Sequence, residues 1–294
     1  MILPYTCGIL FANERIVVAQ KEEKKESYIK IIMENEYGEQ TLAFDEYLLG
    51  VLAAVIPGGY EKETIKAQCV IIRSACYRLL YQSAESRFEK NAILRQEHLN
   101  LPYLTYKERK KIWDDNSLNW EEKFTQAIKE TDGLVIYYKD EVMDMPYFRL
   151  SNGMTREVGT LSYIRAVPCK RDLLSAEYLA VKKIKTDDFY RILELKKEES
   201  NRSILIKKDV NNYVKQVVVG ESIFSGEEFR NLFSLRSSSY SIKREKDEMV
   251  MKTKGVGHGV GFCQYAANQL ILEGNDFMFA LQYFFQNINI QKIV

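Results

Sequence analysis

One stretch of this chain, Lys62 to Gln82, has the periodicity of a long helix that is buried along one side. Its apolar side chains follow at steps of four, three, four and three residues, at Ile65, Cys69, Ile72, Cys76 and Leu79. In a helix of 3.6 residues per turn this spacing places them in one stripe. We therefore predict a long helix that is buried along this stripe.

A shorter helix is expected just before it, from Glu46 to Val55, and Pro57-Gly58-Gly59 ends that helix. The expected strands and helices do not alternate as βαβ units, so we predict an α+β fold with mixed antiparallel strands and hairpins, a long buried helix and C-terminal helices. We expect a single domain over residues 1–294, with a strand-rich insertion or subdomain at about 170–250. Residues 85–120 are polar and charged, and we expect them to form a solvated surface excursion.

The other expected elements follow from short apolar runs between turn residues. Expected strands cover 28–33, 41–44, 134–138, 142–147, 178–185, 203–207, 214–219, 237–243 and 248–253. Expected helices cover 121–130, 186–195, 225–233, 264–272 and 277–285.

Composition excludes several classes of protein. With 46% hydrophobic and 28% charged residues, the chain is typical of a soluble globular protein, and a net charge of +1 gives no case for nucleic-acid binding. The five cysteines are scattered and odd in number, so they do not form a disulfide framework. No stretch approaches the roughly 20 apolar residues of a membrane span. The apolar segment 1–14 lacks basic residues and contains Pro4, so we expect a buried strand there rather than a signal peptide.

Three segments carry residues suited to a binding site. Residues 47–74 read YLLGVLAAVIPGGYEKETIKAQCVIIRS, across the break between the two helices. Residues 151–155 read SNGMT, where small hydroxyl residues around a glycine suit hydrogen bonds to sugar hydroxyls, although this is also an ordinary turn composition. Residues 255–274 read GVGHGVGFCQYAANQLILEG, in which alternating glycines around His258 allow close approach of the backbone to a ligand. This segment lacks the Lys-Ser/Thr of a phosphate-binding loop.

Together these segments resemble the stage II sporulation protein D family of lytic transglycosylases. The first resembles the family pattern Y-x-x-G-V-x-A-A-E-M-P…E-A-L-K-A-Q-A-V-x-A-R, the second S-G-G-x-T, and the third G-x-G-H-G-V-G-M-S-Q-W-G-A. The resemblance implies cleavage of the bond between N-acetylmuramic acid and N-acetylglucosamine, with formation of a 1,6-anhydro end by a single carboxyl group. In the family that group is the Glu of A-A-E-M-P, and this chain has Val55 in its place.

Valine cannot transfer a proton, and general acid–base catalysis typically contributes ~10² to 10⁴ in rate. Three nearby carboxylates are weak substitutes: Glu46 lies about nine residues earlier, and Glu61 and Glu63 lie at the start of the long helix. A helix N-terminus favours the ionised carboxylate, which is a poor acid. We therefore identify no catalytic residue with a convincing role.

Three functions remain open. The first is a sporulation or wall-remodelling protein that binds peptidoglycan glycan strands with lost or strongly reduced catalysis. The second is an active lytic transglycosylase that uses another carboxylate, and the third is a non-enzymatic amidase enhancer that binds a protein. The motifs and the resemblance imply a set of substrate-binding residues: Tyr60, Lys66, Gln68, Arg73, Ser151, Gly153, Thr155, Gly257, His258, Gly259 and Gln264.

The resemblance also implies the surroundings of the protein. Expected partners are peptidoglycan glycan strands and a wall hydrolase or amidase, and the expected location is outside the cytoplasm, at the cell wall or the sporulation septum. We expect no cofactor and no metal. A zinc role for His258 with Cys263 and Cys169 remains an alternative, although the spacing His-x4-Cys is not diagnostic.

Overall fold

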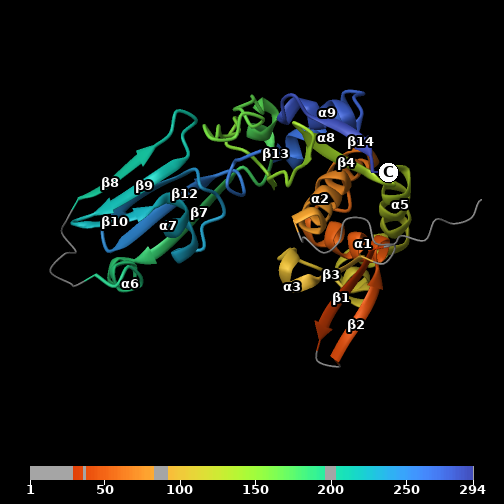
Figure 1. Cartoon of the computed structure of the whole chain (residues 1–294). Helices are drawn as coiled ribbons and strands as arrows, with labels where there is room; N and C mark the ends of the chain where they lie inside the picture. The colour runs from red at the N-terminus through yellow and green to blue at the C-terminus, as the bar shows by residue number, and fades with distance from the viewer. Residues whose placement is uncertain (1–28, 36–37, 83–91, 196–202, 294) are drawn as a thin grey trace, which may run out of the picture.

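The computed structural model describes residues 29–35, 38–82, 92–195 and 203–293. The predicted N-terminal strand at 1–14 lies outside these ranges. The described chain has an α+β fold, as predicted, with two parts that differ in character (Figure 1). We call residues 179–254 the strand-rich part and the other described residues the helical part. No helix of the described ranges has the length and apolar character to span a membrane.

The helical part is organised around the long helix α2. It contains β1 (Ile29–Asn35), β2 (Gly38–Ala43), α1 (Phe44–Val55), α2 (Lys62–Gln82), β3 (Ala92–Arg95), α3 (Gln96–Leu99), α4 (Tyr106–Trp113), η1 (Asp114–Asn116), α5 (Ser117–Glu130), β4 (Leu134–Tyr138), β5 (Glu141–Val142), β6 (Tyr147–Phe148), η2 (Lys170–Leu174), β13 (Phe262–Cys263), α8 (Gln264–Leu272), α9 (Phe277–Phe284) and β14 (Asn289–Lys292).

Helix α2 is buried on more than the predicted stripe. The stripe residues Ile65, Cys69 and Ile72 join a core cluster with α1 and α5. On another side of the helix, Val70 and Ile71 join a second cluster with α8, α9 and the sheet β14-β4-β5. Because two cores share this helix, it fixes the position of α8 relative to α1.

The strand-rich part has a core of its own. It contains β7 (Leu179–Lys185), α6 (Thr186–Ile192), β8 (Ile204–Lys208), β9 (Val214–Val219), β10 (Ser222–Ser225), α7 (Gly226–Leu232), β11 (Tyr240–Glu245) and β12 (Glu248–Lys254). These form two antiparallel sheets, β10-β9-β8 and β11-β12-β7. Between them and α7 lies an aromatic core in which the rings of Phe189, Phe229 and Phe233 contact one another.

Most described residues of the predicted surface excursion, from residue 92 to 120, are exposed, but the segment also contributes to the core. The described portion, from residue 92, contributes β3 alongside β1 and places Trp113 in the core with α1. The ring of Tyr103 stacks on Tyr47 at 5.7 Å between centroids. Buried Arg109 is neutralised by Glu121 at 2.9 Å, which lets a charge-rich segment cover a helix.

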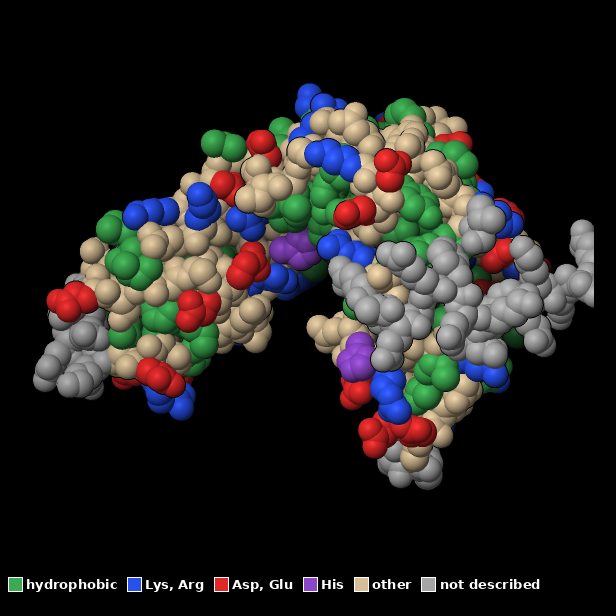
Figure 2. All heavy atoms as spheres, viewed as in Figure 1, with side chains coloured by type: hydrophobic (Ala, Val, Ile, Leu, Met, Phe, Trp, Pro, Cys, Tyr) green, Lys and Arg blue, Asp and Glu red, His purple; other side chains and the backbone are tan. Residues whose placement is uncertain are grey.

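The two parts meet near β13, which pairs in parallel with β6. In Figure 1 the strand-rich part projects to the left of this junction and the sheet β2-β1-β3 projects downward to its right. Figure 2 shows an open hollow on this face between the two projections. Residues that flank β6 and β13 therefore lie where the two walls of the hollow join.

Candidate functional site

The first and third sequence motifs come together at the turn between α1 and α2. The side-chain amide nitrogen of Gln264, the first residue of α8, donates to the carbonyl of Val55 at 3.0 Å and to Gln68 Oε1 at 3.0 Å. One turn later, Asn268 Oδ1 accepts from the backbone N–H of Glu61 and from Thr64 Oγ1, both at 2.9 Å. These bonds join segments about two hundred residues apart, so they hold the turn that carries Val55 in a fixed position.

The glycines of the third motif are required by close packing inside the protein. Gly257 has φ +109° and its absent Cβ would lie 2.7 Å from Phe148 Cβ. Gly259 has φ +83° and a Cβ there would lie 2.3 Å from the Tyr213 ring. The sequence suggested that this loop admits a ligand. Instead, the close approach at these two glycines is made by Phe148 and Tyr213.

His258 is held by both of its ring nitrogens. Nδ1 accepts from the backbone N–H of Val260 at 3.1 Å, and Nε2 lies 3.0 Å from the carbonyl of Tyr147. With Nδ1 as acceptor, Nε2 must carry the hydrogen. Burial lowers the pKa of this imidazole below its usual 6.5, so the ring is neutral at pH 7.

The hydroxyl groups of the second motif also bond within the protein. Ser151 Oγ accepts from the N–H of Gly153 at 3.0 Å, while the N–H of Ser151 donates to Asp172 Oδ2 at 2.7 Å. Thr155 Oγ1 accepts from the N–H of Val167 at 2.8 Å and donates to a carbonyl. Ser151 and Thr155 are fully buried, so they shape the loop and leave no free hydroxyl on the surface.

The predicted binding residues of α2 differ in their surroundings. Arg73 is only 2% exposed and donates to the carbonyls of Thr131 and Ile128 at the end of α5. Lys66 pairs with Glu63 at 2.7 Å and with Glu130 at 3.3 Å. Arg73 and buried Gln68 are thus internal, and Lys66 belongs to an ion-pair network.

Tyr60 is partly exposed on the α1–α2 turn, and its carbonyl accepts from Lys123 Nζ at 2.8 Å. Burial raises the pKa of the Tyr60 phenol, and the positive charge of the neighbouring Arg149 lowers it in part. Of the residues predicted in the first motif, Tyr60 is therefore the one that offers a polar group and an aromatic face on the turn that follows Val55.

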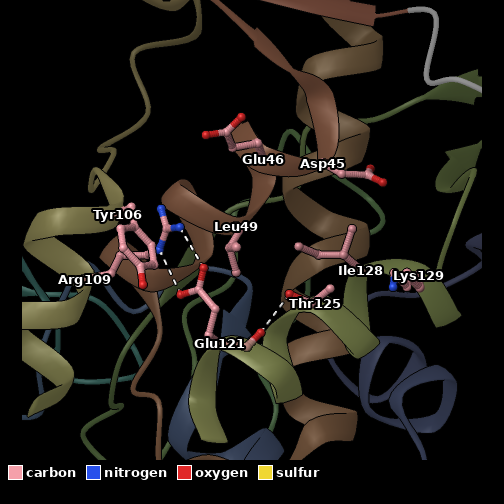
Figure 3. Close-up of a pocket in the computed structure, with 9 residues that line it drawn as sticks. All are labelled: Asp45, Glu46, Leu49, Tyr106, Arg109, Glu121, Thr125, Ile128 and Lys129. Atoms are coloured by element: carbon pink, nitrogen blue, oxygen red, sulfur yellow. Dashed lines mark hydrogen bonds and ion pairs between the residues drawn. The ribbon is translucent and has the colours of Figure 1, made fainter. Parts of the chain in front are cut away.

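The three weak substitutes for the acid lie in different places. Glu46 is at the opposite end of α1 from Val55, about 13 Å away along the helix. It lines a separate cavity of about 370 Å³ with Arg109 and Glu121, shown in Figure 3. Glu63 accepts from the N–H of Phe277 at 3.1 Å and is paired with Lys66. Glu61 is exposed at the start of α2.

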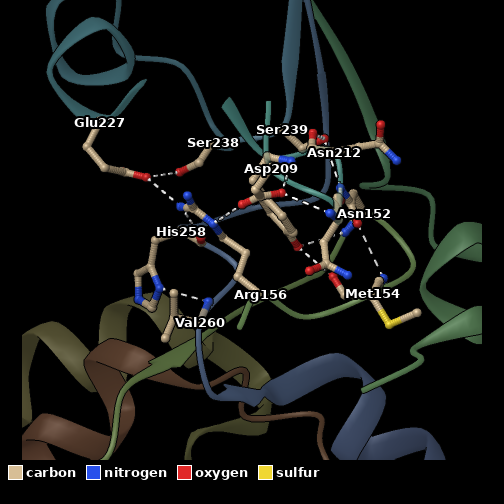
Figure 4. Close-up of polar contacts among 12 residues, drawn as sticks. Asn152, Met154, Arg156, Asp209, Asn212, Glu227, Ser238, Ser239, His258 and Val260 are labelled. Carbon is tan, nitrogen blue, oxygen red and sulfur yellow. Dashed lines mark hydrogen bonds and ion pairs between the residues drawn. The ribbon is translucent and has the colours of Figure 1, made fainter. Parts of the chain in front are cut away.

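Two arginines that flank the SNGMT motif were not predicted from the sequence. Arg149 binds Glu177 through two 2.7 Å hydrogen bonds, and Arg149 lowers the pKa of that carboxyl. Arg156 binds Asp209 at 2.9 Å, Glu227 at 3.3 Å and the carbonyl of His258 at 3.3 Å, as Figure 4 shows. Their positions, two residues before the motif and directly after it, were a usable signal, because charged residues beside a buried loop need partners.

Comparisons with known proteins agree with the motifs. The family model described as stage II sporulation protein (SpoIID) matches residues 33–138. Stage II sporulation protein D of Bacillus amyloliquefaciens is 24% identical over 271 residues, covering 90% of this chain and 78% of the relative. The Bacillus subtilis (strain 168) protein of the same name is 26% identical over 259 residues, covering 86% and 76%. The chain is thus similar to the stage II sporulation protein D family over most of its length.

The similarity to the stage II sporulation protein D family reaches beyond the segment matched by the family model. The alignment with the Bacillus amyloliquefaciens relative leaves out only a tenth of this chain, so it includes both Val55 and the SNGMT loop. An uncharacterized protein of Brachyspira hyodysenteriae is 22% identical over 262 residues, covering 85% of this chain and 67% of that protein.

Proposed function

We propose that this chain acts in sporulation as a protein of the cell wall that binds peptidoglycan glycan strands and has lost most or all cleavage activity. The relatives named stage II sporulation protein D support the sporulation role. Glycan binding, the loss of activity and a location outside the cytoplasm rest on the family resemblance and on the site. Expected partners are glycan strands and a wall hydrolase or amidase.

One observation carries the loss of activity. Gln264 donates to the carbonyl of residue 55 and to Gln68, so the backbone at this position is held in place. The side chain at this position is a valine. A general acid needs a carboxyl group with a raised pKa at the reacting bond. The site therefore has the hydrogen bonds that would position an acid at residue 55, but no carboxyl group there.

The described carboxyl groups with raised pKa values do not replace it. Burial raises the pKa of Asp45, Asp144 and Asp172. Asp45 lies in the first turn of α1, at the far end from Val55. Asp144 interacts with Arg78, about 24 Å along α2 from its first turn. Asp172 is fully buried and bonds to Ser151.

Restoring the acid tests the proposal. We expect wild-type protein to sediment with insoluble, peptide-stripped glycan strands and to release no 1,6-anhydro products detectable by mass spectrometry. Val55→Glu should release them, at a rate at least ~10² times higher than wild type. Val55→Gln is the matched control, because it has a similar shape without an acidic proton, and it should stay inactive.

Two results would contradict the proposal. Release of 1,6-anhydro ends by the wild type would mean that another carboxylate performs the reaction. Failure of the wild type to sediment with glycan would remove the binding role and would favour a protein-binding amidase enhancer.

A further inference from the structure

Three buried side chains form a cluster that the proposed glycan site does not use. Cys169 precedes η2, Asp172 lies within η2, and Cys263 is the last residue of β13. Their two sulfur atoms and a carboxylate oxygen all lie within 4.8 Å of one another. Each residue is at most 3% exposed. The fold therefore brings three groups that bind metals together from segments about ninety residues apart.

One oxygen of this cluster has no partner. Asp172 Oδ2 accepts from the N–H of Ser151 at 2.7 Å and lies 3.1 Å from Cys263 Sγ. The other oxygen, Oδ1, is buried and makes no hydrogen bond. A buried carboxylate oxygen without a partner is destabilising, because nothing compensates for its lost hydration. Such an atom in a native structure calls for an explanation, and an unseen ion is one.

We propose that Cys169, Asp172 and Cys263 bind one Zn²⁺ ion. Zinc accepts thiolate and carboxylate ligands together, at about 2.3 Å and 2.0–2.2 Å, which places the ligand atoms of a tetrahedral site roughly 3.5–4 Å apart. The spacing of the cluster is close to this. Binding would release the two thiol protons to solvent. The N–H of Ser151 donates to this carboxylate and orients it.

His258, the zinc ligand considered from the sequence, is not part of this cluster. Both of its nitrogens bond elsewhere, and Asp172 takes its place. A fourth ligand position is left for water. A cavity of about 320 Å³ reaches Cys169 between Arg171, Ala266 and Tyr283, and it provides an access route for water and the ion.

A disulfide between Cys169 and Cys263 is the competing use of the same sulfurs. It would remove the Cys263 S–H that now lies 3.1 Å from Asp172, and it would still leave Oδ1 without a partner. A metal ion satisfies both sulfurs and the carboxylate, so the observations favour the metal.

The test adds one equivalent of Zn²⁺ to the reduced, chelator-treated full chain. After gel filtration we expect one zinc per chain by mass spectrometry of the metal content. Asp172→Asn and Cys169→Ser should weaken binding by about 100-fold or more in competition with a chelator. Cys69→Ala is the matched control, because it removes a buried thiol from the other core, and it should bind zinc like the wild type.

The wild type alone also gives a decisive readout if a variant fails to fold. Co²⁺ added in place of Zn²⁺ should produce a thiolate-to-cobalt charge-transfer band. Absence of this band, or a wild type that retains no zinc, would overturn the proposal. The same holds if Asp172→Asn binds zinc unchanged, or if the untreated protein has a mass lower by two hydrogens with Cys169 and Cys263 in one cross-linked peptide.

Discussion

At the scale of single residues, the neutral state of His258 makes stability depend on pH. Burial lowers its pKa in the folded chain. The unfolded chain therefore takes up a proton near pH 6.5, before the folded chain does. The contribution of His258 is complete above that pH and is lost as the pH falls toward the folded pKa, at up to ~1.4 kcal/mol per pH unit.

Urea unfolding of the wild type and His258→Gln between about pH 7.5 and 5.5 measures this effect. We expect the variant to lose less stability than the wild type across this range. His98→Gln is the matched control, since His98 is the other histidine and its side chain is 68% exposed. An equal pH dependence in His258→Gln and wild type would contradict the assignment.

The sequence located this site better than it described its chemistry. The motifs pointed to Gln264, Gln68 and residue 55, and the structure brings these together. The sequence could not show that Arg73, Ser151 and Thr155 point inward. A polar residue in a motif gives the same sequence pattern whether it binds a ligand or a backbone carbonyl. Asp172 was missed because its partners, Ser151 and Cys263, are distant in sequence.

At the scale of elements, the glycine loop depends on contacts that only glycine permits. We expect Gly259→Ala to cost about 2–5 kcal/mol of unfolding free energy, because it combines strained backbone with overlap on the Tyr213 ring. Gly274→Ala has a similar φ of +96° with nothing within 4 Å of its Cβ, so it should cost only about 1–2 kcal/mol. Denaturant unfolding compares them, and equal costs would show that the contact with Tyr213 is unimportant.

Elements with long apolar periods, such as α2, were predictable from the sequence, whereas the core contacts of residues 92–120 were not. The charged composition of this segment indicated solvent exposure, but Arg109 is buried through its pair with Glu121, and Tyr103 and Trp113 supply apolar contacts. Periodicity over so few residues cannot distinguish a covering segment from a surface loop. The ion pair between Arg109 and Glu121, which allows this arginine to be buried, is a tertiary contact that the sequence pattern does not reveal.

At the scale of the whole molecule, Arg156 joins the two parts. It extends from the helical part to Asp209 and Glu227 of the strand-rich part. We expect Arg156→Met to leave both acids without this partner, so that amides near residues 209–213 exchange with deuterium at least about tenfold faster. Arg230→Met removes a partner of Glu227 from within α7 and should leave the junction protected. Similar exchange in both variants would contradict a role for Arg156 at the junction.

The bond from Gln264 to residue 55 has an evolutionary consequence, because it is made to the main chain. Every amino acid supplies that carbonyl, so this bond places no requirement on the side chain at position 55, although the valine also packs against the core. A carboxyl side chain can therefore be exchanged for valine here without loss of the bond from Gln264. A valine codon that ends in a purine becomes a glutamate codon by one base change, so a carboxyl group at position 55 is a single mutation away.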